Sequence, residues 1–137
     1  MNAPKWIAPL FWLAALYDGV LGLVFILAPK WPFETFEVTL PNHLAYVQFP
    51  AALLVIFALM FAAVAVNPTG NRNLIPFGIL LKVAYCSVAF SYWLTSDVPT
   101  MWKPLAVTDL VMGLLFAVAY VALRPANQAG GKENANA

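Results

Sequence analysis

Long apolar stretches separated by short polar connections set the pattern of this 137-residue chain. Four such stretches stand out, at residues 7–28, 43–66, 74–94 and 102–123. Each is close to the ~20 residues that an α-helix needs to cross a hydrocarbon core about 30 Å thick. Since backbone groups in lipid must satisfy their own hydrogen bonds, we expect each stretch to be helical. The pattern predicts an all-α membrane protein, a bundle of four transmembrane helices.

Prolines support this division of the chain. Pro76 and Pro104 fall in the first turns of the last two predicted helices, where a missing N–H costs little. Pro50 lies inside the second predicted helix, where we expect it to produce a kink. We assign residues 1–124 to the four-helix transmembrane domain. Residues 125–137 are rich in Asn, Ala and Gly, so we expect a disordered C-terminal tail.

The first connection, "KWPFETFEVTLPN", mixes aromatic and acidic residues. An amphipathic segment of this kind can lie in the headgroup region with its apolar side toward the lipid. An ordinary loop with interfacial aromatic residues explains the same composition. The sequence leaves both interpretations open.

Composition agrees with a membrane environment. The chain is 63% hydrophobic and 9% charged, whereas soluble domains carry roughly 25% charged residues. A net charge of +1 without a basic stripe gives no indication of a nucleic-acid partner. We therefore expect the lipid bilayer to be the main partner, and consider a second copy of the chain or a membrane subunit as protein partners.

Cofactor chemistry has little support in the residue types present. The chain has one histidine, His43, whereas a b-type haem held between helices usually takes two. One histidine and one cysteine, Cys86, on different helices do not form a metal site. No nucleophile–base pair is visible either, so an enzyme is the least favoured class. A quinone is the one cofactor-like ligand that we consider.

Lysine and arginine residues outside the four segments predict an orientation. One side of the bundle would hold four of them (Lys5, Arg72, Arg124 and Lys132), and the other would hold two (Lys30 and Lys103). Cytoplasmic loops carry the excess of positive charge in membrane proteins. We therefore expect a multi-pass protein of the cell (inner) membrane, with both termini in the cytoplasm.

Three charged residues interrupt the apolar segments: Asp18, Lys82 and Asp109. An unpaired ion near the membrane centre costs about 2.5 to 3.5 kcal/mol on insertion scales, so pairing is strongly favoured. Depths counted along the helices place Asp18 near the midplane and within reach of the Lys82 side chain. Asp109 would lie further out, level with Gln48. We expect Asp18 to pair with Lys82, and Asp109 to be bonded by Gln48 and tyrosine hydroxyls or to be protonated.

Helical phase places these residues inside the bundle. On the third predicted helix, Lys82 shares one face with Tyr85 and Cys86. Small residues lie one turn from Asp18 and Asp109, and small residues let membrane helices approach closely. We predict an interior ligand-binding or proton site formed by six residues: Asp18, Gln48, Lys82, Tyr85, Tyr92 and Asp109.

The chain resembles the small bacterial four-helix membrane proteins grouped around DoxX. The resemblance covers residues from about 10 to 123 and is carried by "YDGVLGLVFILAP" in the first helix and "FPAALLVIFALMFAA" in the second. It also rests on the polar residues of the last two helices. The resemblance implies a bundle in the bacterial inner membrane with quinone-linked or redox partners. It carries over no catalytic residue.

Three functions compete on the sequence alone. The first is binding of a small amphipathic ligand, quinone-like or lipid-like, between the helices. The second is proton-coupled transport of a small molecule with Asp18 or Asp109 as the proton site. The third is a non-catalytic subunit whose charges dock against the membrane helices of a larger complex.

Overall fold

The computed structural model describes residues 2–125 and contains helices and connections, with no strand in that range. Four of its helices, over the same residues, are long and apolar enough to cross a membrane. These findings confirm the all-α class and the four long helices; the predicted disordered tail lies outside the described residues, apart from Pro125. The elements are α1 (Ile7–Leu27), α2 (Lys30–Thr35), α3 (Ala45–Val66), η1 (Arg72–Leu74), α4 (Ile75–Thr95) and α5 (Trp102–Ala122).

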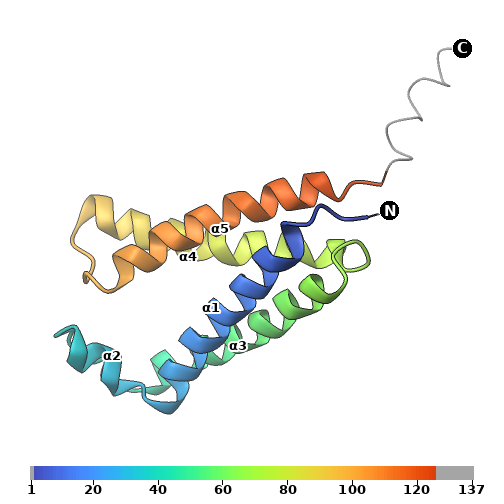
Figure 1. Cartoon of the computed structure of the whole chain (residues 1–137). Helices are drawn as coiled ribbons and strands as arrows, with labels where there is room; N and C mark the ends of the chain where they lie inside the picture. Colours follow the sequence, from blue (N-terminus) through green and yellow to red (C-terminus); the bar gives the residue numbers. More distant parts are fainter. Residues whose placement is uncertain (1, 126–137) are drawn as a thin grey trace, which may run out of the picture.

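The long helices form two pairs (Figure 1). α1 packs along α3, and α4 packs along α5. The pairs converge where α1 and α4 begin and where α3 and α5 end, and we name this the convergent end. They diverge toward α2 and the α4–α5 connection, which we name the cavity end. The helices of the two pairs are therefore farther apart at the cavity end than at the convergent end.

Glycine allows the close approach of α1 and α3. A Cβ atom at Gly22 would lie 2.7 Å from the carbonyl oxygen of Ala51 and 2.9 Å from Cγ2 of Val55. Distances this short leave no room for a side chain. Small residues at such crossings let membrane helices gain van der Waals contact, which replaces the missing hydrophobic force between them.

Aromatic rings fill the convergent end. Phe11, Phe61 and Phe116 come from α1, α3 and α5, and all three are fully buried. The Phe11 and Phe116 rings stack with centroids 4.7 Å apart, and Phe61 lies 5.1 Å from Phe116. Because three helices contribute to one cluster of rings, this core fixes how the two pairs meet.

The outer faces of the long helices are apolar. Large side chains such as Leu16, Leu59, Leu80 and Leu114 are each at least 60% exposed. A surface of this kind is unfavourable in water and suited to contact with lipid tails. The outer surface and the helix lengths together indicate a multi-pass protein in contact with a lipid bilayer.

The first connection contains the short helix α2, so it is more than an ordinary loop. Phe33 of α2 turns into the bundle and is 6% exposed, whereas Trp31 and Phe36 are more than half exposed. The Phe33 ring lies edge-on to Phe25 and to Trp102, with centroids 6.2 and 6.3 Å away. α2 therefore closes part of the cavity end with one aromatic residue and presents others outward.

Candidate functional site

Three helices bring the three intramembrane charges together. The Nζ atom of Lys82 on α4 lies 3.0 Å from both carboxylate oxygens of Asp18 on α1. It also lies 3.0 Å from Oδ1 of Asp109 on α5. Lys82 and Asp18 are each 1% exposed, and Asp109 is 8% exposed. One ammonium group thus donates to two carboxylates in the interior of the bundle.

The pairing of Asp18 with Lys82 is confirmed, whereas the expected bonding of Asp109 by Gln48 and tyrosine hydroxyls is wrong. Asp109 shares the lysine and receives no hydrogen bond from Gln48 or a tyrosine within residues 2–125. The reason is the close approach of α4 and α5. Gly113 faces the lysine stem, and a Cβ atom there would lie 3.2 Å from Cβ of Lys82. Depth counted along separate helices does not include this approach.

Gln48 has a different role. Its side-chain amide donates to the carbonyl of Ile26, 3.1 Å away. Ile26 is in the last turn of α1, where carbonyl groups lack intrahelical partners. Gln48 therefore satisfies the end of a helix and lies outside the charged cluster.

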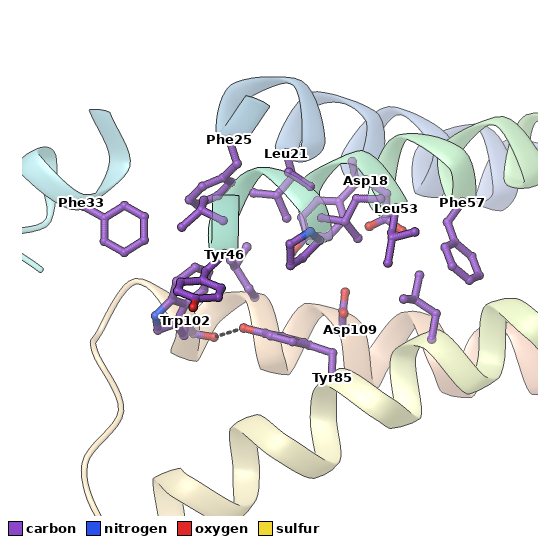
Figure 2. Close-up of a pocket in the computed structure, with 17 residues that line it drawn as sticks. Asp18, Leu21, Phe25, Phe33, Tyr46, Leu53, Phe57, Tyr85, Trp102 and Asp109 are labelled. Atoms are coloured by element: carbon purple, nitrogen blue, oxygen red, sulfur yellow. Dashed lines mark hydrogen bonds between the residues drawn. The ribbon is translucent and has the colours of Figure 1, made fainter. Parts of the chain in front are cut away.

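The two predicted tyrosines have different surroundings in the structure. Tyr85 lies between the helices and donates its hydroxyl hydrogen to the carbonyl of Trp102, 3.2 Å away (Figure 2). Tyr92 is 59% exposed and borders a shallow depression beside Ser91 on the outer face of α4. Tyr92 follows Tyr85 by two helical turns, so helical phase alone does not explain why Tyr92 is exposed and Tyr85 is not.

A cavity of about 410 Å³ lies beside the charged cluster, between the two helix pairs (Figure 2). Its walls are mainly leucine and aromatic side chains. Asp18 and Asp109 are part of its lining, but Lys82 is not. The cavity therefore faces the two acids, with the lysine behind them. The rings that border it come from all four long helices and from α2, and include Phe25, Phe33, Phe57, Tyr85 and Trp102.

Tyr17 adds a polar group that sequence reasoning does not single out. The residue lines the cavity, and its buried hydroxyl has no hydrogen-bond partner within the described part of the chain. Unpartnered buried polar groups are uncommon, because each one loses its hydrogen bonds to water. The one sequence signal for this residue is its place directly before Asp18.

A second cavity, of about 640 Å³, is lined by side chains of α1, of residues 31–36 and of residues 101–105. No Asp, Glu, Lys, Arg or His among the described residues lines it. It shares five lining residues with the first cavity: Tyr17, Leu21, Phe25, Trp102 and Leu105. The two hollows are thus separated by a thin wall of apolar and aromatic side chains.

Metal binding has no geometric support over residues 2–125. No three His, Cys, Asp or Glu side chains in that range are close enough to hold an ion together. The position between the two carboxylates is occupied by the Lys82 ammonium group.

The fold and the charged cluster define a class: a small α-helical membrane protein with four spans and a buried salt-bridge cluster beside an interior cavity. Comparisons with known protein families, with curated proteins and with solved structures found no match to this chain. The cavity and the charged residues beside it are therefore the main indication of function.

Proposed function

We propose that this protein binds a small amphipathic ligand, taken from the membrane, in the cavity between its two helix pairs. The cavity itself carries the proposal. Its volume of about 410 Å³ is within the ~300 to 1,000 Å³ typical of small-molecule sites. Apolar and aromatic walls with a few polar groups at one place are the usual composition of such sites.

The charged cluster supports a binding role over a purely structural one. Buried ion pairs contribute little net stability, because well-packed apolar residues often do as well. Here the ions border a hollow instead of a filled core, and the Asp109 side chain keeps 11% of its surface exposed. An ionisable group that reaches a cavity in a membrane protein is typical of functional sites.

The proposal gives a role to four of the six predicted site residues and no role to the other two. Asp18, Tyr85 and Asp109 line the cavity, and Lys82 holds the two acids in position. The ligand body would lie against the aromatic walls, with its polar end at Asp109 and Tyr17. Gln48 and Tyr92 are not among the residues that line this cavity, so the proposal gives them no contact with ligand. Quinone-like and lipid-like molecules both have an amphipathic character of this kind.

The setting that we propose is the cytoplasmic membrane of a bacterium, as the resemblance to the DoxX group implies. Lys5, Arg72 and Arg124 all lie near the convergent end, since they flank the helix ends found there. Lys30 and Lys103 lie at the cavity end. By the positive-inside rule the convergent end would face the cytoplasm and the cavity would open toward the outer half of the bilayer.

Native mass spectrometry of the protein released from nanodiscs tests the proposal. We expect wild type to retain a co-extracted molecule whose mass falls outside the series of bound lipids. Leu54→Trp, which fills the cavity, should lose that molecule. Leu59→Trp makes the same change on the lipid-facing side of α3, where the leucine is 68% exposed, and should retain it. Retention of ordinary lipids alone, equal in all three proteins, would reject ligand binding in this cavity.

Proton-coupled transport is a second candidate, favoured by the excess carboxylate at the cavity. With the ligand identified by mass spectrometry, proteoliposomes that contain a pH-sensitive dye should report proton movement when that ligand is added. Asp109→Asn should abolish this signal, and Asp97→Asn, at an exposed site, should leave it intact. Ligand flux that is indifferent to a pH gradient would exclude this function.

The subunit hypothesis gains no support from the cluster. The Asp18, Lys82 and Asp109 side chains are buried and bonded to one another within the chain. They are therefore not displayed on the lipid-facing surface, where a partner's helices would meet them.

A further inference from the structure

We infer that the cavity selects a cation: a protonated amine attached to an apolar body. This inference rests on the proposed function and names the chemical class of its ligand. It is carried by charge balance, by the position of Lys82 and by the composition of the walls.

Charge balance leaves one carboxylate without a counterion. The cluster contains Asp18, Asp109 and a single ammonium group, that of Lys82. Two other cations of the described chain are engaged elsewhere. Arg72 donates to the Tyr120 carbonyl at the convergent end, 2.9 Å away, and Lys103 lies 3.3 Å from Asp97 near the surface. A positive ligand beside Asp109 would neutralise the cluster.

The position of the lysine directs this negative charge into the cavity. An ammonium group has three hydrogens, and Lys82 already has three oxygen atoms at 3.0 Å. It lies behind the acids and is not part of the cavity lining. Oδ2 of Asp109 accepts no hydrogen bond within residues 2–125, and this side chain is 11% exposed. A ligand in the cavity therefore meets hydrogen-bond acceptors of negative charge.

The walls suit the same class of ligand. Faces of aromatic rings attract cations, and Phe57, Tyr85 and Trp102 border the cavity. An anion would meet repulsion from Asp18 and Asp109. A neutral carbonyl acceptor would find the Tyr17 hydroxyl but no positively charged donor among the lining residues of the described chain. The expected order of affinity is cation, then neutral molecule, then anion.

Three probes with one carbon skeleton test this order: 4-phenylbutylamine, 4-phenylbutan-1-ol and 4-phenylbutanoate. Equilibrium dialysis against wild-type protein in nanodiscs, with empty nanodiscs subtracted, measures binding beyond partition into lipid. We expect the amine to bind about tenfold more tightly than the alcohol, because a hydrogen bond to a charged group is stronger than a neutral one. The carboxylate should not bind measurably.

Variants then assign the preference to one residue. Asp109→Asn keeps the Lys82–Asp18 pair but removes the negative charge that the amine would meet, so it should reduce the amine-to-alcohol ratio to near one. Asp97→Asn removes the same charge at an exposed site and should leave the ratio unchanged. Leu54→Trp should reduce the binding of both the amine and the alcohol.

The outcomes separate the two proposals. If amine and alcohol bind wild type equally and Leu54→Trp blocks both, the ligand site stands and cation selection is wrong. If no probe binds beyond empty nanodiscs, both proposals fail. The affinities of the amine, the alcohol and the carboxylate are compared on wild-type protein. The test of cation selection therefore does not depend on whether Asp109→Asn folds.

Discussion

The two ends of the molecule are built from similar side chains and pack differently. Phe11, Phe61 and Phe116 at the convergent end form a filled core. At the cavity end, Phe25 and Trp102 stack at 5.8 Å, yet the space beside them is a cavity of about 410 Å³. The charged cluster lies between these regions. Aromatic content alone therefore does not decide whether a membrane bundle is filled or hollow.

The connections and the solvent explain the difference. At the convergent end, α3 and α4 are joined through a short turn and η1, which hold the two pairs together. At the cavity end, α2 and its Phe33 side chain lie between the diverging pairs. Lipid tails are as apolar as the cavity walls, so no hydrophobic force drives this end to close. The space can persist where a soluble protein would collapse.

Lys82→Met should have the largest effect on stability. It leaves Asp18 and Asp109 buried without a counterion at the boundary between the two regions. We expect a loss of about 3 to 5 kcal/mol in the free energy of unfolding, as for other buried pairs that lose one partner. Reversible unfolding in mixed micelles of a mild detergent and dodecyl sulfate measures this loss.

Lys103→Met is the matched control, because its ion pair with Asp97 is exposed and should contribute at most ~1 kcal/mol. Neutralising both Asp18 and Asp109 in the Lys82→Met background should restore most of the lost free energy of unfolding. Equal effects of the two lysine substitutions would show that the buried cluster contributes no more to stability than a surface ion pair.

Phe116→Ala and Phe33→Ala compare the filled and hollow ends directly. Phe116 is fully buried in the three-ring cluster, so its truncation should cost on the order of 3 kcal/mol. Phe33 borders an existing cavity, so its truncation enlarges a space that is already there, and we expect a loss of about 1 kcal/mol. The same unfolding assay applies. A larger loss for Phe33→Ala would mean that α2 carries more of the packing than the filled core.

Gly22→Ala should have a smaller effect than Lys82→Met or Phe116→Ala and tests the packing of the α1–α3 pair. A methyl group at Gly22 would contact the Ala51 carbonyl at 2.7 Å, whereas at Gly19 the nearest atom would be 3.4 Å away. We expect a loss of roughly 1 to 2 kcal/mol for Gly22→Ala in the unfolding assay, in line with other overpacking changes. Gly19→Ala should be neutral or slightly stabilising. If both are neutral, the α1–α3 pair is looser than its geometry indicates.

Much of the fold is predictable from the sequence. Apolar length identifies four helices, because lipid permits few other structures for such segments. The interior face of α4 is also predictable, since Lys82, Tyr85 and Cys86 share one helical face and lie buried or half-buried. The short helix α2 is not, because its six residues, which include a proline and two aromatic residues, are too few to show a distinctive periodicity.

The site is only partly predictable. The Asp18–Lys82 pair is expected from the cost of isolated charge in lipid. The shared bond to Asp109 is not, because it depends on the close approach of α5 at Gly113. The cavity depends on the angle between the helix pairs, which no local pattern encodes. Tyr17 cannot be assigned to the cavity from sequence for the same reason.

The separation of Asp18 and Lys82 by 64 positions has a consequence for biogenesis. At roughly 5 to 20 residues per second, the ribosome adds the lysine about 3 to 13 seconds after the aspartate. During that interval the Asp18 carboxylate of the first span has no Lys82 ammonium group to pair with. Asp18 must therefore stay in contact with water in the insertion machinery, or enter the bilayer protonated, until the α4–α5 pair that contains Lys82 is inserted.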